Sequence, residues 1–272
     1  MMTTKPKPSA KRFTVFTLNI GNTHTRLIGW GTGKPDSAVW KTNSKPSNLS
    51  ALLKANGIPG APIILAGVVP AYKEMLAAAL RTSGRAVHIF RRDLKPRIKI
   101  VPKPPERVGD DRLAAALGAL VLDKTCPWVV VDVGTAMTIN AVRPGSKSKP
   151  PRFEGGLIVP SATTSLRALN HFTAQLPQTE RHRISRRDPF IGRNTEDAMV
   201  LGVYHAQFAA AVALTQGQLK ELGPRARAVI TGGGANFAPA FCIALNRCAV
   251  SVEDLVHLGL YAAWQQSERS HG

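Results

Sequence analysis

The chain has 272 residues, enough for two modest domains, and 44% of them are hydrophobic, so a sizeable core can form. Its longest purely apolar run, 113–122, is far shorter than the ~20 residues of a membrane-spanning helix. We therefore expect no membrane segment and no signal peptide. The three cysteines lack the spacing of metal ligands and indicate reduced thiols, which predicts a cytoplasmic protein.

The formal net charge of +19 is distributed unevenly. Nine Lys and Arg residues against two acidic ones occupy 81–107, and four more basic residues lie in the tail 1–12. A second group of arginines comprises Arg181, Arg183, Arg186, Arg187 and Arg193. Such clusters suit polyanions, but a solvated basic surface or attraction for anionic substrates explains them as well. No aromatic interleaving or nucleic-acid motif accompanies them, and nucleic-acid binding is not expected.

The first half of the chain predicts an α/β unit after a polar tail, 1–12, that is expected to be disordered. Strands are predicted at 13–18, 26–30, 63–70 and 86–90. Helices are predicted at 47–56, 71–81 and 113–122. The basic, proline-rich stretch before the last of these helices, 94–108, is predicted to be a loop.

The second half repeats the order of strand, turn and strand. Strands are predicted at 128–132, 136–142, 155–160, 228–231 and 250–252. Helices are predicted at 163–172, 195–219, 237–246 and 256–265. The helix over 195–219 is apolar on all sides and is expected to be buried. The repetition indicates a duplicated α/β unit, with one lobe over 13–124 and the other over 125–272.

A glycine turn follows the first strand of each half. Asn19-Ile20-Gly21-Asn22-Thr23 ends the first of these strands, and Asp132-Val133-Gly134-Thr135 ends the other. Glycine permits close approach of a ligand to the backbone, and successive N–H groups form a nest for anions. Either turn alone could be an ordinary hairpin turn. Together they suit a triphosphate in a cleft between two lobes.

The order of these and other short motifs resembles the type III pantothenate kinases, members of the acetate kinase, sugar kinase, Hsp70 and actin superfamily. The matching motifs are Asn19–Arg26, Gly109-Asp110-Asp111-Arg112, Asp132–Ala136, Gly155–Pro160 and Thr231-Gly232-Gly233-Gly234. The resemblance extends over residues 13–264. It implies an α/β fold of two duplicated ribonuclease H-like lobes with a nucleotide cleft between them.

The resemblance also implies roles for individual residues. Asp111 would be the general base at the substrate hydroxyl. The pantothenate site would contain Gly109, Asp110, Arg112 and Thr195. The ATP site would contain Asn19, Ile20, Gly21, Asn22, Thr23, Arg26 and Thr135. Asp132 would hold a monovalent cation, K⁺ or NH₄⁺, and Mg²⁺ would accompany ATP. The implied protein is a homodimer that phosphorylates pantothenate in the first step of coenzyme A synthesis.

The residues themselves support this chemistry in part. Phosphoryl transfer needs positioning, charge neutralisation and a proton acceptor, and Asp111 beside Arg112 at a helix start is expected to stay ionised. Asp111 could instead be a salt-bridged acid at the helix start, and Asp132 a strand-end acid that caps the following turn. Asn19 stands where the family has Asp, and Pro102 where it usually has Tyr. These departures leave open an impaired pseudokinase or a regulatory accessory protein on the same scaffold.

Overall fold

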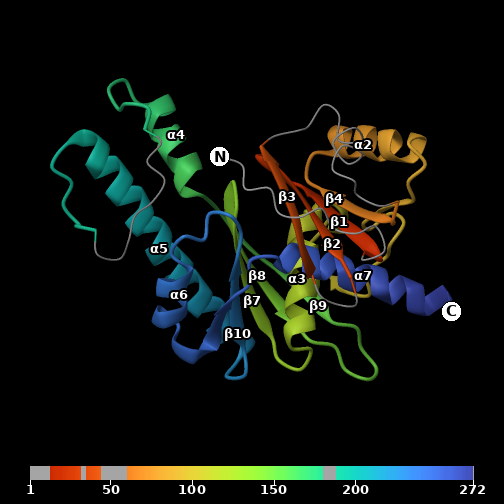
Figure 1. Ribbon diagram of the computed structural model, residues 1–272. Coiled ribbons are helices and arrows are strands. Elements are labelled where there is room, and N and C mark those ends of the chain that lie inside the picture. Colours follow the sequence, from red (N-terminus) through yellow and green to blue (C-terminus); the bar gives the residue numbers. More distant parts are fainter. Residues whose placement is uncertain (1–12, 32–34, 44–59, 180–187, 272) are drawn as a thin grey trace. The chain divides into compact units, whose positions relative to one another are not determined.

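The computed structural model describes residues 13–31, 35–43, 60–179 and 188–271 (Figure 1). The predicted tail 1–12, the predicted helix 47–56 and four arginines of the second basic group lie outside these residues. The chain divides into two compact units. One contains residues up to Arg97, together with Glu106–Gly118 and Val256–Gly272, and the other contains Ile98–Pro105 and Ala119–Leu255. The last helix, assigned to the second lobe from the sequence, thus groups with the first unit.

The first unit is built on a five-stranded mixed sheet with the strand order β3-β2-β1-β4-β5. Its strands are β1 (Val15–Ile20), β2 (His24–Trp30), β3 (Pro35–Asn43), β4 (Ile63–Gly67) and β5 (Val87–Ile89). β1 pairs antiparallel with β2, and β2 with β3, whereas β4 runs parallel to both β1 and β5. The sheet places the turn after β1 at the same edge as the end of β4.

Two helices of the first unit pack on opposite faces of the sheet, because successive side chains of β1 point to opposite faces. Phe16, Leu18 and Ile20 are fully buried in a cluster that includes Leu76 of α2 (Pro70–Thr82). The alternate residue Thr17 contacts α7 (Leu255–His271) through His257. α7 therefore packs on the opposite side of the sheet from α2. The third helix is α3 (Asp110–Leu122), whose first turns belong to this unit.

The second unit repeats the strand order of the first. Its six-stranded sheet has the order β11-β10-β7-β8-β9-β6. The strands are β6 (Lys99–Ile100), β7 (Trp128–Val133), β8 (Ala136–Arg143), β9 (Arg152–Pro160), β10 (Arg227–Thr231) and β11 (Ala249–Ser251). β8 pairs antiparallel with β7 and with β9, whereas β10 and β11 run parallel to β7. This is the pairing pattern of β1 to β5, which agrees with an internal duplication.

Three helices complete the second unit: α4 (Ala162–Phe172), α5 (Thr195–Leu222) and α6 (Ala238–Ala244). α5 packs on the sheet through its C-terminal half, where Gln218 Nε2 donates to the Ile139 carbonyl at 2.9 Å. The prediction that this helix is buried on all sides was wrong. In the structure only 28% of its most apolar stretch is buried. Among the described helices, α5 alone is long and apolar enough to cross a membrane, a test that core helices of soluble proteins also pass.

Two strands were not predicted, and one helix begins earlier than expected. β3 is an edge strand that begins with Pro35, a position where proline costs no ladder hydrogen bond. β6 has only two residues and forms by pairing with β9. α3 begins at Asp110 rather than Leu113, so Asp110, Asp111 and Arg112 lie in its first turn. Short 3₁₀ turns occur at η1 (Pro105–Arg107) and η2 (Asn246–Cys248).

Candidate active site

The first glycine turn is a tight connection between β1 and β2. The Gly21 N–H donates to the His24 carbonyl at 2.9 Å and closes the turn. Asn22 and Thr23 are exposed at its tip, whereas Ile20 is fully buried and belongs to the core. Ile20 can therefore contribute only backbone atoms to a ligand site. The exposed tip offers the amide and hydroxyl groups that phosphates bind.

Asn19 and Arg26 lie directly opposite each other in the β1–β2 pairing. The Oδ1 atom of Asn19 is buried and has no hydrogen-bond partner among the described residues. Two residues earlier on the same side of β1, the Thr17 hydroxyl accepts from Trp30 Nε1 and contacts His257 Nδ1, both at 2.8 Å. Burial and the positive charge of Arg26 lower the pKa of His257 to about 3. The imidazole is thus neutral, and Arg26 carries the positive charge on this side of the sheet.

At the N-terminus of α3, the side chain of Asp111 lies against the backbone of Gly109. The first helical hydrogen bond runs from the Leu113 N–H to the Gly109 carbonyl. Asp111 Oδ1 accepts from the Arg112 N–H at 2.8 Å and would lie 2.5 Å from a Cβ on residue 109. The carboxylate therefore occupies the space that only glycine leaves open.

The pKa of Asp111 departs from the sequence-based expectation. Burial raises it, and the negative charge of Asp110 raises it further, although the Arg112 N–H and guanidinium lower it. The neighbouring Arg112 was expected to keep this pKa low, but burial is the larger effect. A raised carboxylate pKa makes the group a better proton acceptor at neutral pH, provided that it remains ionised.

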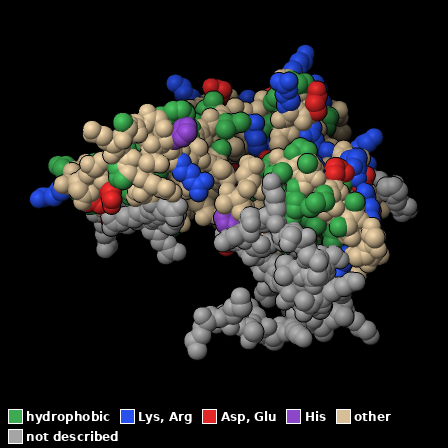
Figure 2. Space-filling model, turned by 90° about the horizontal axis from the view of Figure 1, so that it is seen from above, with side chains coloured by type: hydrophobic (Ala, Val, Ile, Leu, Met, Phe, Trp, Pro, Cys, Tyr) green, Lys and Arg blue, Asp and Glu red, His purple; other side chains and the backbone are tan. Residues whose placement is uncertain are grey.

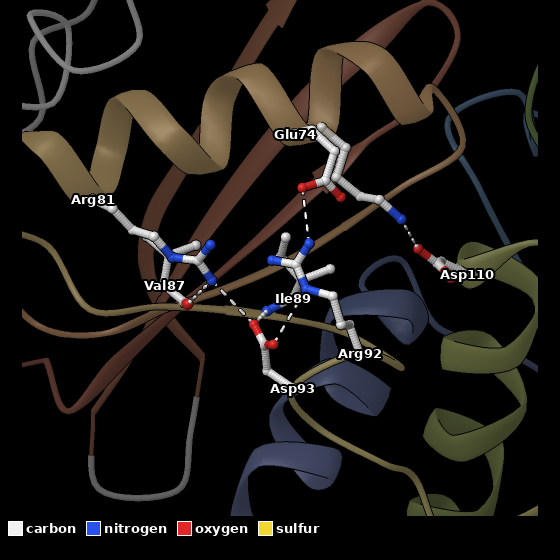
Figure 3. Close-up of polar contacts among 8 residues, drawn as sticks. Glu74, Arg81, Val87, Ile89, Arg92, Asp93 and Asp110 are labelled. Carbon is white, nitrogen blue, oxygen red and sulfur yellow. Dashed lines mark hydrogen bonds and ion pairs between the residues drawn. The ribbon is translucent and has the colours of Figure 1, made fainter.

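The carboxylate of Asp110 lies in an ion-pair cluster. Its Oδ2 atom lies 2.7 Å from Lys73 Nζ, a contact drawn in Figure 3. Its Oδ1 atom lies 3.7 Å from Arg91 Nη1. No local sequence pattern links Lys73 and Arg91 to this helix, because they lie on α2 and on the loop after β5. Asp110, which the resemblance assigns to the pantothenate site, thus has both carboxylate oxygens in ion pairs with basic side chains.

In the second unit, the turn after β7 lies against the glycine turn that follows β10, Gly232-Gly233-Gly234. Asp132 is half-buried at the end of β7, and its Oδ1 atom would lie 2.5 Å from a Cβ on Gly232. Gly232 has a φ of 99°, and the Gly234 N–H donates to the Val133 carbonyl at 2.8 Å. The structure thus brings together two of the turns singled out from the sequence.

Thr135 and Thr195 lie in different parts of the second unit. Thr135 is exposed just beyond Asp132, and its carbonyl accepts from Thr164 Oγ1 at 2.6 Å. Thr195 is exposed as the first residue of α5, next to the N-cap Asn194. The part of α5 that packs on the sheet is its other end (Figure 1). Thr195 begins the part of α5 that packs on α4, where Met199 and Val200 form a cluster with Leu166.

The fold and the two turns define a class of protein. Two α/β units with the same strand order, each with a glycine turn after its first strand, form the duplicated α/β fold predicted from the sequence, and solved structures share this fold. A solved structure described as a Baf family transcriptional activator from Campylobacter jejuni is similar, with a TM-score of 0.57 and 17% identity. The match covers 93% of this chain and 99% of that one. This likeness confirms the predicted fold.

Sequence comparison identifies the family within this class. The profile of the family described as type III pantothenate kinase matches residues 15–216. A type III pantothenate kinase of Dehalococcoides mccartyi is 31% identical over 232 residues, covering 80% of this chain and 84% of the relative. That of Halorhodospira halophila is 29% identical over 266 residues, covering 90% and 98%. The chain belongs to the type III pantothenate kinase family.

Proposed function

We propose that this protein transfers the γ-phosphate of ATP to the primary hydroxyl of pantothenate, giving 4′-phosphopantothenate. The observation that carries the proposal is the first turn of α3 in a chain of this family. There a partly buried carboxylate, Asp111, is fixed by the Arg112 N–H over Gly109. Such a carboxylate can accept the proton that the hydroxyl loses as it attacks phosphorus.

The protein's part in the reaction is to neutralise charge and to hold the reactants. We propose that the exposed turn residues Asn22, Thr23 and Thr135 bind the phosphates of ATP. Arg26, beside the first turn, supplies positive charge, and Arg112 supplies it beside the base. A substrate carboxylate would be attracted by Arg112 and by the general excess of basic residues. Positioning of this kind supplies most of the catalysis in phosphoryl transfer.

We propose that Mg²⁺ enters the site bound to ATP, and that the described residues supply few of its ligands. No group of three or more His, Cys, Asp and Glu side chains gathers as a metal site in this part of the chain. Mg²⁺ is commonly held by substrate phosphates with only one or two protein ligands. The buried, unpartnered Oδ1 atom of Asn19 could supply such a ligand, and Asp132 could hold K⁺ or NH₄⁺. When bound, these cations would neutralise phosphate charge.

We also propose that the protein is a cytoplasmic homodimer that associates through α4, α5 and the described residues 188–194 before α5. Phe172, Phe190 and Ile191 are 81%, 80% and 75% exposed, and Phe190 stacks on His205 of α5. Large exposed apolar groups often mark association surfaces. Thr195 lies beside this surface and would enter a substrate site through the partner. The cytoplasmic location is proposed because the three cysteines of the protein are free thiols, which suit a reducing compartment.

Nucleic acid is not the expected partner. On the face shown in Figure 2, Lys and Arg side chains are scattered among other residue types. No nucleic-acid-binding motif accompanies the basic residues in the sequence. A small anionic substrate needs only the few cations near its site.

The experiment that tests the proposed function combines binding with turnover. ATP with Mg²⁺ should raise the melting temperature, because a ligand that binds only the folded state stabilises it. Pantothenate with K⁺ should then cause ADP release in a coupled assay. Absence of turnover in a folded, dimeric preparation would contradict the kinase proposal. Stabilisation by ATP without turnover would favour the pseudokinase alternative that Asn19 raises.

A further inference from the structure

A buried ion-pair cluster lies beneath the first turn of α3. Lys73 Nζ of α2 contacts Asp110 Oδ2 at 2.7 Å, and the Gly67 N–H of β4 approaches the same oxygen at 3.5 Å. Arg91 Nη1 lies 3.7 Å from Asp110 Oδ1. The side chains of Lys73, Arg91 and Asp110 are only 15%, 20% and 9% exposed. Three elements of the first unit therefore converge on one carboxylate next to Asp111.

Arg91 is held in an unusual conformation at this point. Its φ of 68° lies in the left-handed region, which a residue with a Cβ adopts at a cost. The conformation is fixed by a hydrogen bond from its own N–H to the Leu94 carbonyl at 2.9 Å. The Nη1 atom also donates to the Val108 carbonyl, just before Gly109. Arg91 thus holds both the chain that enters α3 and the carboxylate of its first residue.

We propose that Lys73 and Arg91 are positioning residues for phosphoryl transfer. Through Asp110 they hold the first turn of α3 and balance the charge of Asp110, so that Asp111 can act as the base. The inference rests on the proposed function in one respect only, the role of Asp111. Neither Lys73 nor Arg91 is required to touch a substrate.

The electrostatic part follows from the charges that face Asp111. These are Arg112 and Asp110 on its own helix. Asp110 in turn pairs with Lys73 on α2 and with Arg91 on the loop after β5, so these two cations act on Asp111 through Asp110. Burial and Asp110 already raise the pKa of Asp111. Loss of the Lys73 charge would leave more of the Asp110 charge uncompensated. The pKa of Asp111 should then rise further, and the base should be protonated at a higher pH.

The neighbouring residues provide a matched control. Arg92 follows Arg91 in the chain and pairs at 2.9 Å with Glu74, which follows Lys73 (Figure 3). Both of these side chains are about half exposed. Exposed pairs of this kind contribute little. Arg92→Met therefore removes the same charge as Lys73→Met from a neighbouring, solvated pair. A purely structural effect of Lys73 would change the melting temperature but would not move the pKa of Asp111.

The test measures the pKa of Asp111 directly by carboxyl ¹³C NMR on the full-length protein, with the resonance assigned by Asp111→Asn. Lys73→Met should raise this pKa by roughly one unit, the scale on which a nearby charge acts. The acidic limb of kcat/KM should move upward equally. Lys73→Arg and Arg92→Met should leave both near the wild-type values. The double variant Lys73→Met/Asp110→Asn should return the pKa toward the wild-type value, because both charges are then absent.

Two results would overturn the inference. One is an unchanged pKa of Asp111 in folded Lys73→Met, and the other is an equal shift in Arg92→Met. If Lys73→Met does not fold, Lys73→Gln and the double variant provide the same comparison. The NMR titration needs no turnover, so it stays informative even if wild-type protein fails to phosphorylate pantothenate. That failure would reject the proposed function alone.

Discussion

Adding a single methyl group at Gly109 should impair catalysis while leaving the fold intact. A Cβ there would lie 2.5 Å from Asp111 Oδ1, about 0.9 Å short of an ordinary contact, and its other neighbour, Val68 Cγ1, is 3.8 Å away. The clash is with the end of a side chain, which can rotate away. A displacement of about 1 Å at a reacting group can cost roughly 10²-fold in rate. We therefore expect Gly109→Ala to lower kcat about 100-fold and the free energy of unfolding by less than about 1 kcal/mol.

Steady-state kinetics and chemical denaturation of the same preparation test this expectation. Gly217→Ala serves as the control, because a Cβ at this position in α5 meets nothing within 4 Å. It should leave kcat unchanged. If Gly109→Ala keeps kcat within about threefold of the wild-type value, the carboxylate position does not limit the reaction. A loss of folding that accompanies the loss of activity would also refute the reasoning.

Three further substitutions test other parts of the site. Asn19→Asp should tighten Mg²⁺–ATP binding and raise turnover at limiting Mg²⁺, because a carboxylate attracts the cation more strongly than an amide; calorimetry that finds equal or weaker affinity would contradict this. Gly232→Ala should lower the free energy of unfolding by about 2 kcal/mol or more, because a φ of 99° and an approach of 2.5 Å to the Asp132 carboxylate both oppose a Cβ. Unchanged urea denaturation would disprove it. His257→Gln should make the free energy of unfolding depend less on pH in the acid range. The pKa of His257 is about 3 in the folded state and 6.5 in the unfolded state, so the neutral imidazole contributes its full stabilisation above pH 6.5 and loses it as the pH falls. The wild-type loss from this residue is about 2 kcal/mol by pH 5, and identical pH profiles of both proteins would refute the assignment.

The local sequence predicted most of the regular structure because the patterns concerned are local. Alternating or continuous apolar runs predicted β1, β2, β4, β7 and β8, and the two paired glycine turns were found where β1 and β7 end. β3 was not predicted, because it begins with Pro, Asp and Ser, which are rare in strands. It forms by pairing with β2. The extent of burial of α5 could not be predicted either. Its apolar surface exceeds what the sheet of its own chain covers.

The site was predicted only where its residues are adjacent in sequence. Gly109, Asp111 and Arg112 act together within one helical turn, so their motif was visible. Lys73 and Arg91 reach that turn through the packing of α2 and of the loop after β5, and nothing in their local sequence indicates it. The direction of the pKa shift of Asp111 was missed for the same reason, since burial depends on the whole fold.

The most direct test of the central claim is the transfer of radiolabel from [γ-³²P]ATP to pantothenate by wild-type protein and by Asp111→Asn. Wild-type protein should form labelled 4′-phosphopantothenate in the presence of Mg²⁺ and K⁺. Asp111→Asn should bind ATP with the same affinity and melt at the same temperature, but its kcat should fall by about 10² to 10⁴. Full activity of Asp111→Asn would remove Asp111 from the role of base. Absence of labelled product with the wild-type protein would contradict the assignment of the protein as a pantothenate kinase.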